Sequence, residues 1–101
     1  MQGYETYLLQ WSGLRVEVRY CADWSTAFRA VYGHAMAHLE VDAGGHPLPC
    51  TEIGYLSVFE RADSIAAAGG PLAYVADGLA IAARSPEWIA RQKAERQLPL
   101  F

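Results

Sequence analysis

The stretch YETYLLQWSGLRVEVRY, residues 4–20, decides the fold. In its second half, residues 14–20, apolar or aromatic side chains alternate strictly with charged ones, and this period of two predicts a strand with one buried face. The first half repeats the pattern less cleanly, with Tyr7, Leu9 and Trp11 on one face. Between the halves, Ser12-Gly13 makes a two-residue link in which the glycine tolerates positive φ. The stretch therefore predicts a β-hairpin.

Two further strands follow the hairpin in the sequence. Residues 37–42 alternate again and predict a third strand, and residues 51–59 predict a fourth strand with Gly54 as a bulge. The glycines and prolines of residues 43–49 mark the loop between them. Residues 24–32 have large apolar side chains at helical spacing after two candidate caps, Asp23 and Ser25. The alternative for that segment is irregular chain leading into the third strand.

The last 40 residues or so have helical patterns. Asp63 can cap a short helix that ends at Gly69-Gly70, Pro71 suits the first turn of a second helix, and Ser85-Pro86 repeats the signal for a third. The predicted fold class is α+β: an antiparallel sheet of about four strands (residues 4–59) packed by two or three C-terminal helices (residues 62–96).

The third helix changes character along its length. Trp88 and Ile89 are expected to anchor its start to the domain, whereas residues 91–96 carry no large apolar side chain and should project into water. We therefore expect residues 1–90 to form a single α+β domain and residues 91–101 to form a polar helical stalk with a C-terminal peptide.

Composition narrows the classes of function. The 101 residues suffice for one core, and 52% hydrophobic against 19% charged residues indicates a globular chain. A net charge of -3 argues against strong direct nucleic-acid binding. No apolar run is as long as a membrane span, and two cysteines are too few for a disulfide framework. We expect a cytoplasmic protein with free thiols and no membrane contact, and the oligomeric state stays open.

The C-terminal residues Gln97-Leu98-Pro99-Leu100-Phe101 form a small apolar peptide. They resemble the motif Gln-Leu-x-Leu-Phe by which bacterial replication and repair proteins bind the DNA polymerase sliding clamp. The resemblance implies that Gln97 bonds at the rim of a groove on this protein partner, while Leu98, Leu100 and Phe101 fill its pockets. Pro99 departs from the usual small polar residue and removes an N–H. The alternative is that these side chains fold back over the domain's own core.

A zinc site is the second candidate, built from His34, His38, His46 and Cys50. The first two histidines share a face on a helix or a strand because they are four residues apart. Against a metal, the chain lacks a closely spaced cysteine pair, so we expect no cofactor. Neither cysteine lies in a sequence context typical of a nucleophile, so we do not expect an enzyme.

Two surfaces of the body could also bind a partner. Acidic Glu40, Asp42 and Glu52 would cluster if the third and fourth strands pair. Aromatic residues are concentrated in the first quarter of the chain, where we expect them to pack as core; exposed Tyr7 and Tyr20 would instead indicate a binding face.

Parts of the body, residues 49–55 with 67–71 and 74–75, are similar to small uncharacterised proteobacterial proteins, some of them on mobile elements. The first functional hypothesis is a non-enzymatic adaptor or regulator that docks on the sliding clamp. The second is a mobile-element inhibitor of host defence, anti-restriction or anti-CRISPR, acting through protein contacts at the acidic sheet face. The third is a small zinc-binding domain.

Overall fold

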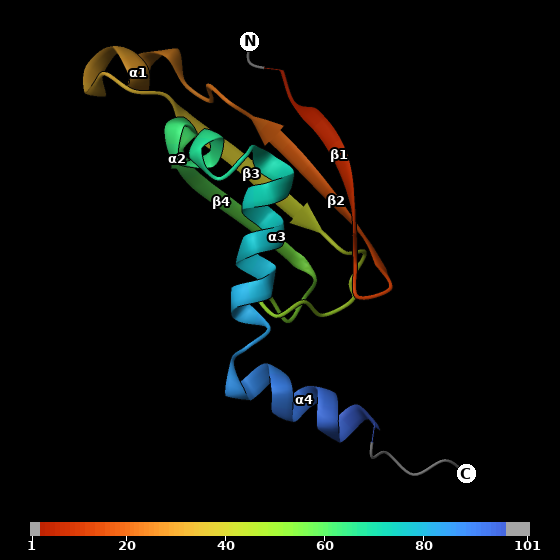
Figure 1. Cartoon of the computed structure of the whole chain (residues 1–101). Helices are drawn as coiled ribbons and strands as arrows, with labels where there is room; N and C mark the ends of the chain where they lie inside the picture. The colour runs from red at the N-terminus through yellow and green to blue at the C-terminus, as the bar shows by residue number, and fades with distance from the viewer. Residues whose placement is uncertain (1–2, 97–101) are drawn as a thin grey trace.

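The computed structural model describes residues 3–96 and confirms the predicted α+β fold (Figure 1). A four-stranded antiparallel sheet is followed by three C-terminal helices in this part of the chain. The elements are, in order, β1 (Glu5–Trp11), β2 (Leu14–Cys21), α1 (Thr26–Tyr32), β3 (Met36–Asp42), β4 (Tyr55–Arg61), α2 (Ala62–Ala67), α3 (Pro71–Ala82) and α4 (Pro86–Arg96).

The hairpin forms where the sequence predicts it. Trp11 lies opposite Leu14, and the two residues between them, Ser12 and Gly13, have φ of 48° and 78°. Two positive φ angles define a type I′ turn, whose twist matches that of the flanking strands. The sheet then continues as a simple meander in the order β1-β2-β3-β4, each strand antiparallel to the last.

One face of the sheet makes the core. Helices α2 and α3 lie across this face (Figure 1), and alternate residues of the central strands pack against them. The fully or nearly fully buried members of this core include Val16, Val18, Ala37, Leu39 and Val41 from the sheet and Ile65, Val75 and Leu79 from the helices. Among the hairpin aromatics, Tyr7, Trp11 and Tyr20 pack against the same core, half-buried. The other face of the sheet is left free of α2 and α3.

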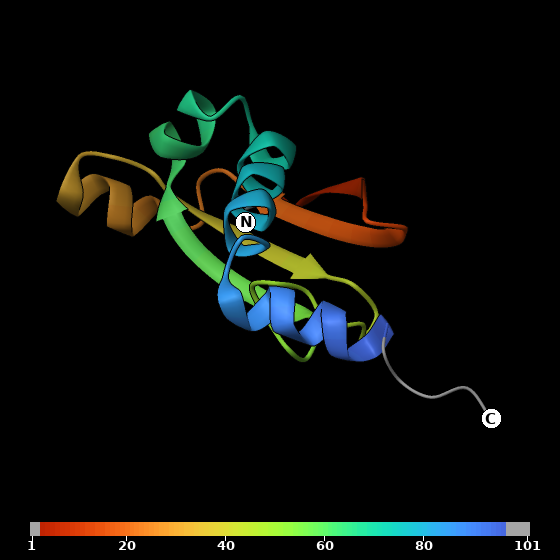
Figure 2. The ribbon, with the colours of Figure 1, turned by 60° about the horizontal axis from the view of Figure 1, so that its bottom comes forward.

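Residues 26–32 are helical, as one of the two interpretations predicted, but Trp24 lies before the helix rather than on it. The Ser25 hydroxyl accepts a hydrogen bond from the backbone N–H of Phe28 at 3.1 Å and so caps α1. No residue of α1 is buried. This short helix lies at the opposite end of the molecule from α4 in both views (Figures 1 and 2).

Two details of the prediction for residues 51–59 are wrong. The strand begins at Tyr55, and Gly54 is not a bulge but a turn residue with φ of 76°. A Cβ on Gly54 would lie 2.5 Å from the backbone oxygen of His46, so the loop passes too close for any other residue. Ile53, on the same alternating pattern, is 72% exposed because it precedes the strand.

Only one of the two expected anchors of α4, the half-buried Trp88, packs on an aromatic ring of the body. The indoles of Trp88 and Trp11 lie 6.1 Å apart between ring centres, whereas Ile89 is 49% exposed. The helix continues to Arg96, and residues 93–96 are exposed. Within residues 3–96, no helix has the length and apolar character needed to cross a membrane.

Candidate functional site

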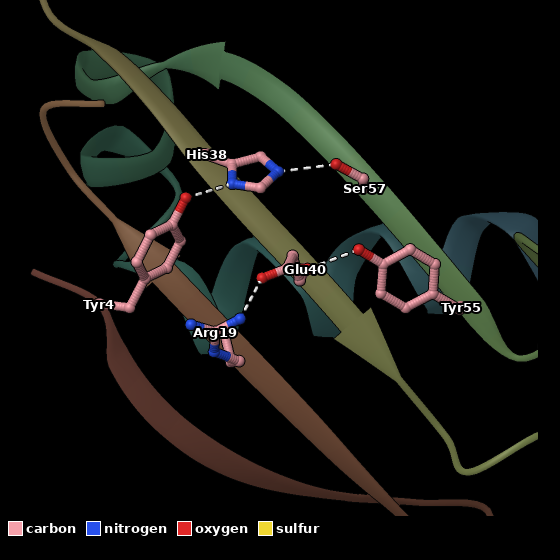
Figure 3. Close-up of polar contacts among 6 residues, drawn as sticks. All are labelled: Tyr4, Arg19, His38, Glu40, Tyr55 and Ser57. Carbon is pink, nitrogen blue, oxygen red and sulfur yellow. Dashed lines mark hydrogen bonds and ion pairs between the residues drawn. The ribbon is translucent and has the colours of Figure 1, made fainter. Parts of the chain in front are cut away.

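The free face of the sheet carries a connected group of polar and aromatic side chains (Figure 3). They come from alternate positions of β2, β3 and β4, whose other residues form the core, and from the segments next to β1 and β2. We call this group the open-face network. Its members are Tyr4, Arg19, Trp24, His38, Glu40, Tyr55, Ser57 and Phe59.

His38 lies at the centre of the network. Its Nδ1 is 2.6 Å from the Tyr4 hydroxyl and its Nε2 is 2.7 Å from the Ser57 hydroxyl, so both ring nitrogens are hydrogen-bonded whichever tautomer is present. The imidazole also stacks on the ring of Phe59, its cross-strand partner, with 4.5 Å between the ring centres. The ring is therefore fixed in position by three neighbours.

Glu40 joins β2 to β4. Its Oε1 accepts a hydrogen bond from Nη1 of Arg19, directly opposite on β2, at 2.5 Å. Its Oε2 accepts from the Tyr55 hydroxyl, also at 2.5 Å. This hydrogen bond raises the pKa of Tyr55, since ionised tyrosine could no longer donate, and partial burial acts in the same direction.

Arg19 connects the two halves of the network. Its guanidinium carbon lies 4.6 Å from the centre of the Tyr4 ring, a cation–π contact, while the same side chain pairs with Glu40. The pKa of Tyr4 is raised above its usual value, first by burial and then by the nearby acidic groups of Cys21 and Glu40. The hydroxyls of Tyr4 and Tyr55 both have a pKa above the usual tyrosine value, so both can donate a hydrogen bond throughout the neutral range.

Three members of the network, Trp24, Phe59 and Tyr55, form an exposed aromatic rim. The indole of Trp24 meets Phe59 edge to face, with 4.8 Å between the ring centres. Trp24 is 46% exposed, Phe59 51% and Tyr55 39%. Exposed tryptophan, tyrosine and phenylalanine side chains on the same face as an arginine are typical of a protein-binding site.

The four candidate zinc ligands are not brought together. His38 belongs to the open-face network, and His34 lies against the Phe28 ring at 5.4 Å between ring centres. His46 lies in the loop beside Trp11 and α4, and Cys50 lines a separate hollow against the start of α4. Among residues 3–96, no three His, Cys, Asp or Glu side chains are grouped so as to hold a metal ion.

The expected acidic cluster is also incomplete. Glu40 and Asp42 share the free face of β3, but Glu52 lies in the loop before β4. Arg15 and Arg19 occupy alternate positions of β2 on this same face. The face is therefore mixed in charge rather than acidic, and Glu40 is paired. The predicted clamp-binding residues Gln97, Leu98, Leu100 and Phe101 lie outside the described residues.

Residues 4–88 match the family described as KlcB third domain. The chain belongs to this family. No curated protein and no solved structure matches the chain. The KlcB third domain match takes in every member of the open-face network and ends at Trp88, before the polar half of α4. Membership suggests a plasmid-associated protein, in keeping with the mobile-element context expected from the sequence.

Sequence reasoning identified His38 and Glu40 but missed the other members of the network as a group. The sequence of β4 did carry a signal, since Tyr55, Ser57 and Phe59 alternate with Leu56 and Val58 and must therefore lie on opposite faces of the strand. That alternation does not reveal which face is covered. The burial of Leu56 and Val58 against the core decides it.

Proposed function

We propose that this KlcB third domain is a non-enzymatic, cytoplasmic inhibitor domain that binds a protein of a host restriction system through the open-face network. The observation that carries the proposal is the exposed Trp24–Phe59–Tyr55 rim held around the Arg19–Glu40 pair on the free face of the sheet. The family match, which suggests a plasmid-associated protein, supports the class of partner.

The network is suited to protein binding because its side chains are already ordered. Tyr55 and Arg19 are held by Glu40, and Phe59 is held between Trp24 and His38. Side chains fixed before binding lose little conformational entropy when a partner arrives. Tyrosine, tryptophan and arginine are also the residues that most often dominate binding energy at protein interfaces.

The charge distribution favours a protein partner over a nucleic acid. Two basic residues, Arg15 and Arg19, share the face with three acidic ones, Glu17, Glu40 and Asp42, so a phosphate backbone laid on it would meet more acidic than basic groups. A mixed face instead fits complementary charges on another protein.

The hydrogen-bonded chain from Ser57 through His38 to Tyr4 resembles a catalytic triad, with a nucleophile, a base and a group that orients the base. Catalysis also needs a concave site that holds the substrate and excludes water. Ser57 is exposed on an open sheet face, so the arrangement supports a binding role for these groups.

The test is protection of an unmodified phage from restriction in cells that express the chain. We expect the wild type to raise the efficiency of plating, and Phe59→Ser or Trp24→Ser to reduce that protection by roughly tenfold or more. Ile81→Ser is the matched control, since Ile81 is 64% exposed on α3. Failure of the wild type to protect against any restriction type, or full protection by Phe59→Ser, would contradict the proposal.

A second candidate function is docking on the bacterial sliding clamp through the C-terminal QLPLF sequence. It is favoured by the polar helix α4, whose exposed final turn reaches Arg96 immediately before Gln97. The test is titration of purified clamp with the intact chain, with a chain lacking Leu100-Phe101, and with Lys93→Ala as control. Equal affinity of the intact and truncated chains would end this hypothesis without affecting the first one.

A further inference from the structure

The outer edge of β1 presents backbone groups that have no partner among residues 3–96. The type I′ turn determines which groups these are. In a two-residue hairpin the closing pair, here Trp11 and Leu14, exchanges both hydrogen bonds, and bonded pairs then alternate along the ladder. The N–H and C=O groups of Thr6, Leu8 and Gln10 therefore point away from β2.

The two edges of the sheet differ in protection. On β4, the Thr51 hydroxyl donates to the Tyr55 carbonyl at 2.9 Å, and the Glu60 carboxylate accepts from the Arg61 N–H at 2.8 Å. This strand also runs directly into α2. In contrast, β1 has no proline, no lysine and a single charge, Glu5, at its start. Natural edge strands normally carry prolines, lysines or other charges that prevent pairing with another chain.

We propose that two copies of this chain pair through β1, antiparallel, with Leu8 opposite Leu8 of the second copy. Thr6 and Gln10 lie two residues either side of Leu8, so the outward groups are arranged symmetrically about it. Each of these residues has one N–H and one C=O, and a two-fold axis at Leu8 pairs all of them. Pairing with a strand of another protein would satisfy the same groups but has no such reason to centre on Leu8.

The side chains are compatible with this register. Leu8, 51% exposed on the free face, covers its counterpart, and Thr6 lies opposite Gln10. On the inner face, Tyr7 lies opposite Leu9 and Glu5 opposite Trp11. No like charges face each other, which is the usual source of cross-strand repulsion.

The pairing makes one continuous sheet with the two open-face networks on the same side, because the two-fold axis is perpendicular to the sheet. The interface is a single strand from each copy and is therefore small. We expect a dimer with a dissociation constant on the order of micromolar to tens of micromolar.

Disulfide cross-linking tests the register. In a Cys50→Ser background, where the remaining Cys21 is buried, Leu8→Cys should form an intermolecular disulfide readily. Directly opposed residues of a bonded pair have Cα atoms about 5.5 Å apart, within the range for a disulfide. Thr6→Cys alone should not cross-link, since the two copies of residue 6 would be about 13 Å apart along the strands. A mixture of Thr6→Cys and Gln10→Cys should cross-link.

Sedimentation velocity tests the dimer itself. Leu8→Pro removes an outward N–H without removing a β1–β2 bond, and proline is tolerated on an edge in that position. We expect the wild type and Leu8→Val to dimerise alike at about 100 µM, and Leu8→Pro to weaken the dimer at least tenfold. A monomeric wild type at that concentration, or equal cross-linking of Leu8→Cys and Thr6→Cys, overturns the proposal. If Leu8→Pro is unfolded by circular dichroism, the cross-linking pattern decides.

Discussion

Tyr55 on β4 donates a 2.5 Å hydrogen bond to the Glu40 carboxylate on β3. The same carboxylate pairs with Arg19 on β2, so one acidic side chain holds groups from both neighbouring strands. The Glu40 side chain is 19% exposed, and its partners Arg19 and Tyr55 are more exposed, so the group still reaches the surface of the free face.

The first prediction concerns the titration of Tyr55. Its pKa is raised mainly by the hydrogen bond to Glu40, so Glu40→Gln should lower the pKa toward the usual value of about 10. Because the pKa of Tyr55 is higher in the folded than in the unfolded state, its hydrogen bond stabilises the fold at pH values below the unfolded-state pKa. This contribution is lost as the pH rises through the folded-state pKa. NMR of the tyrosine Cζ carbons measures the shift, with Glu87→Gln as control. An unchanged Tyr55 pKa in Glu40→Gln would contradict the assignment.

The second prediction concerns Gly54. An alanine there would need φ near 76° and would place its Cβ 2.5 Å from the His46 oxygen, so we expect a loss of about 3 kcal/mol or more. Gly44 has φ of 66° but nothing within 4 Å of a Cβ, so Gly44→Ala should cost only about 1 kcal/mol. Urea denaturation measures both. Equal losses in the two variants would show that the close approach of His46 is not limiting.

The third prediction concerns the docking of α2. Ile65 is the one buried residue of this helix and is 0% exposed, so Ile65→Ala should destabilise the fold by about 2–5 kcal/mol. The matched control is Ile81→Ala, which removes the same atoms from a side chain that is 64% exposed and should change stability by less than about 0.5 kcal/mol. A similar unfolding midpoint for both variants would mean that α2 contributes little to the core.

The fourth prediction concerns the attachment of α4. Trp88 meets Trp11 at 6.1 Å between ring centres, and Ile89 is half exposed. Trp88→Ala should therefore speed hydrogen exchange of the α4 amides by roughly tenfold while leaving the β3 amides protected. Ile89→Ala should have little effect on either set. Faster exchange across the whole sheet in Trp88→Ala would show that α4 is an integral part of the core.

The sheet could be predicted from the sequence because each strand has one covered face. The alternation in residues 14–20 and 37–42 shows directly which side chains lie on the covered face. The turn residues Ser12-Gly13 and the helix-starting Pro71 indicate where elements end or begin. The start of β4 could not be read in this way. Ile53 fits the alternation, and only the close packing of the 43–54 loop at Gly54 shows that the strand has not yet begun.

The site was less predictable than the fold because it depends on register. Arg19 and Glu40 are 21 positions apart in the sequence, and their pairing requires the exact alignment of β2 with β3 across α1. Likewise, the contact between Tyr4 and His38 depends on the meander, in which only β2 separates β1 from β3, so that the long tyrosine side chain can span it. By contrast, the zinc hypothesis relied on sequence spacing alone, and the fold separates His34, His46 and Cys50.

The alternation of β3 has an evolutionary consequence. Ala37, Leu39 and Val41 maintain the fold, while His38, Glu40 and Asp42 between them face outward. If the outward residues bind a partner as proposed, selection for stability and selection for recognition act on different codons of the same seven-residue strand. Under the proposed function, exchange of these outward codons would change the target in a few steps without a new core.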